Sequence, residues 1–168
     1  MGENAVTKAG AWLQEMHRLE PQLHVLHGLE YREVFSVTRA AGGIADNVLP
    51  AEFVLNLNYR FPPVYSLEVA EARLREVAAA ADAVHIKDRA PAGSIPENNP
   101  LLDRLEGLVG GDIAAKQGWT DVARLSAHGI PAVNFGPGQP LLAHQANESV
   151  PLGNIDKAYE DMLTLLVD

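Results

Sequence analysis

Apolar side chains near the start of the chain recur at every third or fourth position, which is the spacing of one helix face. These residues are Ala5, Ala9, Trp12, Leu13, Met16 and Leu19. The pattern predicts an amphipathic helix over residues 3–19, ended by Pro21. His24 and His27 follow in a connecting loop and are most simply solvated polar residues. We do not expect a metal site at this pair, because no acidic residue stands at helical spacing to complete one.

Two later segments alternate apolar and polar residues with a period of two, which is typical of strands. Residues 34–39 alternate in this way, and residues 53–61 do so more strictly, with one packed face and one mostly polar face. The link between them, residues 41–50, is rich in turn-forming residues.

An alanine-rich helix is predicted next, over residues 67–81, with Ser66 as its N-cap, and residues 83–87 predict a short strand. The order helix, strand, strand, helix, strand is that of a ferredoxin-like βαββαβ unit without its first strand.

A segment rich in proline, residues 90–100, predicts a boundary between a domain at 1–90 and a second part at 91–168. The second part alternates expected helices and short strands, as an α/β domain does, but it has too few strands for a sheet of its own. Helices are expected over residues 101–109, 120–127 (capped by Thr120) and 155–167, and strands over 113–116 and 131–135.

Composition narrows the functional classes. The formal net charge of -9 argues against nucleic-acid binding, which needs a basic face. No apolar run approaches the length of a membrane helix, and the N-terminus lacks the apolar segment of a secretory signal, so a cytoplasmic protein is expected. With no cysteine in the chain, any metal would be held by histidines and carboxylates.

His144 stands out among the histidines because of its position. It lies in a loop that follows the predicted strand 131–135 and the turn Gly136-Pro137-Gly138, and Glu148 comes four residues later. Loops that follow strands in α/β folds are where ligands collect. From spacing alone, a ligand-binding histidine and an ordinary surface histidine remain equally open.

Several motifs in this second part together resemble the C-terminal signature of the zinc exopeptidase and aminoacylase family. They are Gly118-Trp119-Thr120-Asp121, Gly129-Ile130-Pro131-Ala132, Gly136-Pro137-Gly138, Ala143-His144 and Asn147-Glu148-Ser149-Val150. Residues 42–50 and 58–61 resemble the lid domain of the same family. Within the family, residues 98–101 and 116–121 are most similar to the desuccinylases that act on N-succinyl-diaminopimelate.

The resemblance implies an α/β fold: a ferredoxin-like, α+β lid and dimerisation domain, followed by the C-terminal part of a catalytic domain. It also implies a role for individual residues. His144 matches a ligand of one of two zinc ions, with cobalt as an alternative in one site, and Glu148 matches a residue that orients the loop. Asn47 and Arg60 match lid residues that reach the oxyanion and a carboxylate of an acidic N-acyl amino acid. Thr120, Gly136 and Gly138 match positions that line the same pocket.

The motifs for the other zinc ligands and for the general base are absent from the sequence, so we expect negligible hydrolysis by this chain alone. The family implies an enzyme that removes succinyl from N-succinyl-diaminopimelate and a homodimer formed through the lid. A related deacylase, such as an acetyl-ornithine deacetylase, remains open as the activity. From a different class, a non-catalytic dimerisation module also remains open.

Overall fold

The computed structural model describes residues 2–110 and 113–167. Contacts divide it into two compact units. Unit 1 consists of Met1–Ala92 together with Ala115–Trp119, and unit 2 consists of Gly93–Ala114 and Thr120–Asp168. Each unit is described by itself below.

Unit 1 begins with two short helices, α1 (Ala5–Lys8) and α2 (Gly10–Arg18). The side chain of Asn4 caps α1 by accepting hydrogen bonds from the backbone N–H groups of Val6 and Thr7. The continuous helix predicted over residues 3–19 is therefore wrong in one respect. The break falls next to Gly10, a residue type that is unfavourable inside a helix.

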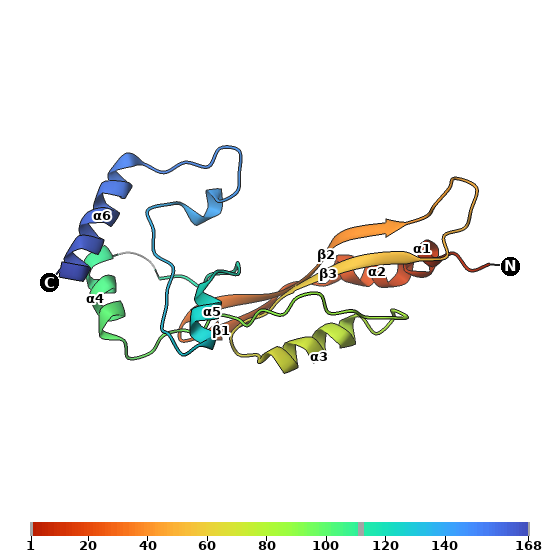
Figure 1. Ribbon diagram of the computed structural model, residues 1–168, viewed down its shortest axis with the longest axis horizontal. Coiled ribbons are helices and arrows are strands. Elements are labelled where there is room, and N and C mark those ends of the chain that lie inside the picture. The colour runs from red at the N-terminus through yellow and green to blue at the C-terminus, as the bar shows by residue number, and fades with distance from the viewer. Residues whose placement is uncertain (1, 111–112, 168) are drawn as a thin grey trace. The chain divides into compact units, whose positions relative to one another are not determined.

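The sheet of unit 1 is antiparallel, with the strand order β1-β2-β3, and its strands run side by side in Figure 1. Its strands are β1 (Gln22–Leu26), β2 (Leu29–Gly42) and β3 (Phe53–Arg60). His27 and Gly28 form the two-residue turn between β1 and β2, with φ of 51° and 78°. Positive φ at both positions is the type I′ geometry that suits the twist of a hairpin, and glycine adopts it without strain.

Strand β1 corrects the expectation of a loop around His24. It pairs with residues 29–33 of β2, whereas residues 34–42 of β2 pair with β3. The predicted strands 34–39 and 53–61 lie within or nearly coincide with β2 and β3 and are confirmed as strand regions. A bulge between Val37 and Arg39 interrupts the second ladder.

Helix α3 (Leu67–Val77) begins as predicted, with Ser66 Oγ accepting the backbone N–H of Val69 at 3.3 Å. It lies beside α2, because Trp12 Nε1 donates a hydrogen bond of 2.7 Å to the carbonyl of Val77. The strand predicted over 83–87 is wrong, since these residues alternate in exposure but form no ladder with the sheet. Unit 1 is thus a mixed α/β arrangement of one antiparallel sheet and two longer helices, which confirms the expected class.

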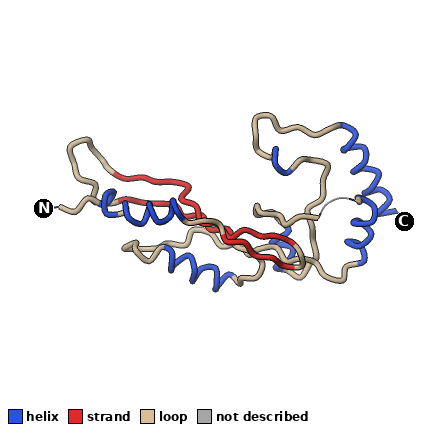
Figure 2. Tube along the Cα trace, turned by 180° about the vertical axis from the view of Figure 1, so that it is seen from behind, coloured by secondary structure: helices blue, strands red, loops and turns tan. Residues whose placement is uncertain are grey.

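Unit 2 contains helices and irregular segments within its described residues, as Figure 2 shows. Its elements are α4 (Pro100–Val109), α5 (Val122–Ala127), the 3-10 helix η1 (Pro140–Leu142) and α6 (Leu152–Val167). Helices α4 and α6 lie side by side, and the Arg104 guanidinium donates to the carbonyl of Thr164 at 3.3 Å. No helix in the described residues is long and apolar enough to cross a lipid bilayer.

Three expectations for the second part of the chain are corrected. Residues 113–116 and 131–135 are not strands, because neither segment forms a ladder with a described strand. Thr120 does not cap α5 with its side chain; its hydroxyl instead accepts a hydrogen bond from Asn134 Nδ2 at 3.2 Å.

The apolar core is small. Among the described residues, the buried hydrophobic side chains include Ala70 and Ala78 in unit 1 and Leu105 and Ala123 in unit 2. Many large apolar side chains are exposed instead, among them Leu152 at 79% and Leu166 at 74% on α6. Exposed apolar surface of this kind is typical of a face that packs against further protein.

Candidate functional site

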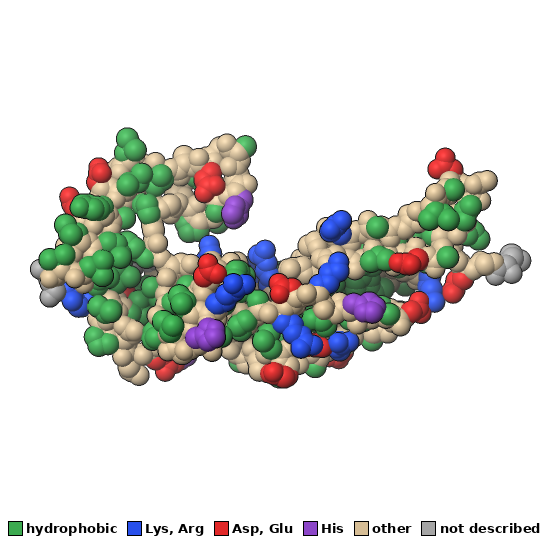
Figure 3. Space-filling model, viewed as in Figure 1, with side chains coloured by type: hydrophobic (Ala, Val, Ile, Leu, Met, Phe, Trp, Pro, Cys, Tyr) green, Lys and Arg blue, Asp and Glu red, His purple; other side chains and the backbone are tan. Residues whose placement is uncertain are grey.

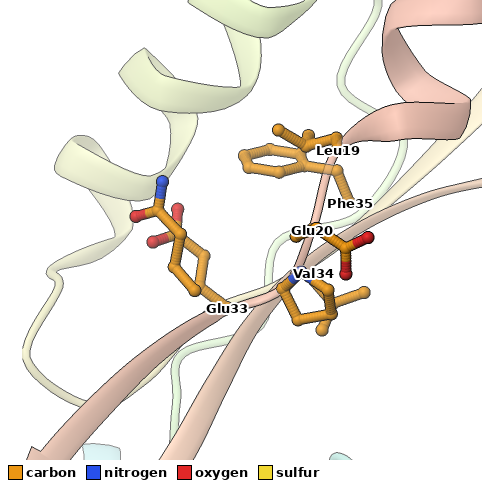
Figure 4. A pocket seen from close by; sticks show the side chains of 7 residues that line it. Leu19, Glu20, Glu33, Val34 and Phe35 are labelled. Atoms are coloured by element: carbon orange, nitrogen blue, oxygen red, sulfur yellow. The ribbon is translucent and has the colours of Figure 1, made fainter.

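A buried carboxylate lies on the face of the sheet that the helices cover. Glu33 of β2 is 2% exposed, and its side chain points toward α3 in Figure 4. Tyr59 Oη donates to Glu33 Oε1 at 2.7 Å, and Arg73 Nε donates to the same oxygen at 2.8 Å. His24 Nε2 lies 3.0 Å from the other oxygen, Oε2. The carboxylate therefore joins all three strands to α3.

The charge of Glu33 is stabilised by these partners. Burial raises the pKa of Glu33, but the hydrogen bonds from Tyr59, Arg73 and His24 outweigh it and hold this pKa below its ordinary value. Burial and the bond to Glu33 raise the pKa of Tyr59, so that the phenol stays a donor. The Arg73 guanidinium also lies 4.9 Å from the ring centroid of Tyr65, a cation–π contact.

We interpret this Glu33 cluster (Glu33, His24, Tyr59 and Arg73) as a scaffold and not as a reaction centre. The adjacent pocket, lined by residues that include Leu19, Gln22 and Phe35, has a volume of about 20 Å³. That space suits a single water molecule and not a substrate. The sequence signal that could have revealed the cluster is the hairpin dipeptide His27-Gly28, which sets the register of β1 against β2.

The opposite face of the sheet carries Arg60. Its Cα partner across the ladder is Val34, so the two side chains share a face. In Figure 4 Val34 points away from the side to which Glu33 and Phe35 point. Arg60 is exposed and forms no ion pair with the described carboxylates. This geometry makes its guanidinium free to bind an anion.

Asn47 and Arg60 do not come together within one copy of unit 1. Asn47 lies in the exposed loop that leads into β3, whereas Arg60 is the last residue of β3. A strand rises about 3.3 Å per residue, so the ends of β3 are roughly 23 Å apart. A single small substrate therefore cannot contact both residues in one copy of the chain.

The remaining predicted pocket residues belong to unit 2. Thr120 is partly buried and hydrogen-bonded to Asn134. A Cβ at Gly136 or Gly138 would meet no atom within 4 Å, so packing in the structure does not require glycine at either position. The backbone between them is nonetheless fixed, because Asn154 Nδ2 donates to the carbonyl of Pro137 at 3.3 Å.

His144 is exposed and has a positive φ of 65°. Its backbone N–H donates to Glu148 Oε2 at 3.0 Å, so Glu148 shapes the loop that presents the imidazole. Within residues 2–110 and 113–167, no three histidine or carboxylate side chains converge in a way that could hold a metal ion. A tetrahedral zinc site needs at least three protein ligands, so the described residues do not form one by themselves.

Gln117 is a residue that motif reasoning did not single out for its contacts. Its side-chain Oε1 accepts the backbone N–H of Arg32 at 3.0 Å, and its Nε2 donates to the carbonyl of Glu30 at 2.8 Å. These backbone groups lie where β2 has β1 on one side and no strand on the other. The amide of Gln117 thus occupies a free strand edge, as a neighbouring strand would.

Comparison with known proteins places these features in a family. The family model described as the peptidase dimerisation domain matches residues 1–85. The chain is 41% identical, over 95% of its length, to a Mycobacterium tuberculosis protein named "putative succinyl-diaminopimelate desuccinylase", of which it covers 46%. It is 35% identical, over 92% of its length, to the succinyl-diaminopimelate desuccinylase of Corynebacterium glutamicum, of which it covers 43%.

A third relative carries a different name. The chain is 29% identical, over 76% of its length, to the N-acetyl-L-citrulline deacetylase of Xanthomonas campestris, of which it covers 37%. The chain thus spans less than half the length of each of these relatives. Since the family model covers half of the chain, including the sheet with its helices α2 and α3, the chain belongs to the peptidase dimerisation domain family.

Proposed function

We propose that this chain is the lid-bearing part of a zinc-dependent amide hydrolase that removes succinyl from N-succinyl-L,L-diaminopimelate in the cytoplasm. The observation that carries the proposal is the 41% identity over 95% of the chain, which extends over both units. Such an enzyme releases succinate and diaminopimelate, the latter a precursor of lysine and of cell-wall peptide.

The chain's own residues would bind and orient the substrate. The exposed guanidinium of Arg60 suits bidentate binding of a substrate carboxylate. The side-chain amide of Asn47 would donate to the oxygen on which negative charge develops during amide hydrolysis. Thr120, together with the backbone at Gly136 and Gly138, would line the pocket next to the acyl group.

The proposal includes a homodimer, which the placement of Asn47 and Arg60 supports. Asn47 and Arg60 lie at opposite ends of β3, so one substrate can meet both only if they come from two copies of the chain. The match to a dimerisation domain supports the same arrangement.

When bound, zinc would polarise the amide carbonyl and activate water, with cobalt as an alternative ion in one site. His144 is the residue of this chain that would contribute a ligand, and the exposed imidazole fits that role. Because the described residues offer no complete site, the other ligands and the general base would come from protein outside this chain. The exposed apolar side chains of α6 offer a surface against which such a segment would pack.

Two other functions are each favoured by a specific observation. The similarity to an N-acetyl-L-citrulline deacetylase favours a deacylase with another acyl amino acid as substrate. The match of the dimerisation domain model to residues 1–85, with no complete metal site among the described residues, favours a non-catalytic association module.

A substrate panel separates these functions. The chain would be co-expressed with the part of the Corynebacterium glutamicum desuccinylase that it does not match, and the purified complex supplied with zinc. N-succinyl-L,L-diaminopimelate, N-acetyl-L-ornithine and N-acetyl-L-citrulline would be offered separately. We expect succinate release to exceed release of acetate. Faster acetate release would favour the deacylase, and a dimeric, folded complex without any hydrolysis would favour the association module.

A further inference from the structure

The open face of the sheet, opposite the Glu33 cluster, carries a second arginine beside Arg60. Side chains alternate between faces along a strand, so Arg32 shares the face of Val34. Val34 is the direct cross-strand partner of Arg60, and Arg32 and Arg60 therefore lie diagonally across the ladder. Diagonal neighbours lie roughly 7–8 Å apart, with their Cβ atoms somewhat closer. In Figure 3, Lys and Arg side chains lie on the surface with Asp and Glu side chains among them.

Neither arginine has a carboxylate partner among the described residues. Both side chains are exposed, and no ion pair joins either of them to a described Asp or Glu. Glu30 is on the same face as Arg32, yet it forms no ion pair with it. Two neighbouring guanidinium groups repel each other, and an anion with two negative groups would relieve that repulsion.

The backbone at Arg32 is held in place by Gln117. The Gln117 amide accepts from the N–H of Arg32 and donates to the carbonyl of Glu30, at 3.0 Å and 2.8 Å. These bonds fix the strand segment from which the Arg32 side chain extends. A guanidinium on a fixed backbone loses less entropy on binding than one on a mobile loop.

We propose that Arg32 and Arg60 together form a dicarboxylate site, in which each guanidinium binds one carboxylate, and that Arg32 makes the enzyme selective for succinyl over acetyl substrates. The inference rests on the proposed function for the role of Arg60 and adds Arg32 as a specificity residue. A succinyl amide of an amino acid carries a distal acyl carboxylate as well as an amino-acid carboxylate, whereas an acetyl amide lacks the first.

The test is a titration of the chain with sodium succinate, followed by the backbone and arginine side-chain N–H signals in NMR spectra. Acetate provides the monocarboxylate comparison, and ionic strength is held constant with sodium chloride. The variants are Arg32→Gln and Arg60→Gln. Arg39→Gln is the matched control, because Arg39 pairs with Asn56, four residues and about 13 Å along β3 from Arg60 on the same face. That separation exceeds the Debye length of about 10 Å at 0.1 M salt.

We expect saturable succinate binding that weakens about tenfold in Arg32→Gln and in Arg60→Gln and changes less than about twofold in Arg39→Gln. Arg32→Lys should recover only part of the loss, since an ammonium group binds a carboxylate as a point charge. Equal effects of Arg32→Gln and Arg39→Gln, or no saturable succinate binding by the folded chain, would overturn the dicarboxylate site. Succinate binding that weakens in Arg60→Gln but not in Arg32→Gln would also overturn the dicarboxylate site, while leaving the proposed function intact. The proposed function itself fails separately, if the co-expressed complex releases no succinate.

Discussion

The phenol of Tyr59 donates a hydrogen bond of 2.7 Å to Oε1 of Glu33, a carboxylate that is only 2% exposed. Tyr59→Phe removes this donor but keeps an aromatic ring at position 59, which can stack on Phe35 as the tyrosine ring does. A hydrogen bond to a charged group contributes about 1.5–3 kcal/mol, so we expect the variant to lose roughly 1.5 kcal/mol of unfolding free energy. Urea unfolding measures the loss. Tyr31→Phe, a tyrosine of the same sheet, is the control and should change stability by less than about 0.5 kcal/mol.

Removing Glu33 itself should cost more than removing one donor. Glu33→Ala leaves the guanidinium of Arg73 partly buried without its carboxylate partner. Breaking such a pair costs about 3–5 kcal/mol when it is fully buried, and we expect the lower end here because the Arg73 side chain is 33% exposed. Differential scanning calorimetry would report the change. A Glu33→Ala protein as stable as the parent would show that the Glu33 cluster contributes little to the fold.

The Glu33 cluster also predicts an acid-sensitive stability. Burial raises the pKa of Glu33, but the hydrogen bonds from Tyr59, Arg73 and His24 lower it below its ordinary value. A carboxyl group with a depressed folded-state pKa stabilises the fold at any pH above its unfolded pKa, about 4.3, and this contribution is lost as the pH falls through the folded-state pKa. Urea unfolding between pH 7 and pH 3 should show the parent losing stability below about pH 4.5.

The comparison for that experiment is Glu33→Gln, which keeps the shape of the side chain and removes its titration. Its stability should be lower than that of the parent at pH 7 and should vary less with pH in the acid range. An identical acid slope in both proteins would assign the pH dependence to other carboxylates.

The bond from Gln117 to the hairpin should be visible in amide exchange. Gln117→Ala removes the acceptor for the N–H of Arg32, and we expect that amide to exchange about five- to tenfold faster, as loss of a hydrogen bond of about 1 kcal/mol implies. The control is Gln145→Ala, because the Gln145 amide donates to Leu141 within unit 2. If Arg32 exchanges equally in both variants, the Gln117 contact does not hold the strand edge.

Much of the fold was predictable where local pattern and local structure agree. The alternation over 53–61, the Ser66 cap of α3 and the helix over 101–109 were all predicted and are present. The strand predictions at 83–87 and 131–135 were wrong, because a strand needs a pairing partner, and sequence periodicity indicates exposure but not pairing.

The candidate site was less accessible to sequence reasoning for the same reason. The sequence pattern predicted a loop at His24, whereas the turn at His27-Gly28 places this residue on β1 beside Glu33. The two hydrogen bonds of Gln117 join residues about 85 positions apart, and no short motif encodes such a contact. The roles assigned to Asn47, Arg60, Thr120, Gly136, Gly138 and His144 rest on motif resemblance and stay predictions.

His144 offers the most direct measurement of the central proposal, that this chain contributes a metal ligand to an amide hydrolase completed by other protein. The quantity is the rate of succinate release from N-succinyl-L,L-diaminopimelate, with zinc, by the chain alone and by its complex with the complementing segment. We predict no release by the chain alone. In the complex we predict release that falls at least about tenfold in His144→Gln, as loss of a metal contact implies. Succinate release by the chain alone, or equal rates for the parent and His144→Gln complexes, would contradict the proposal.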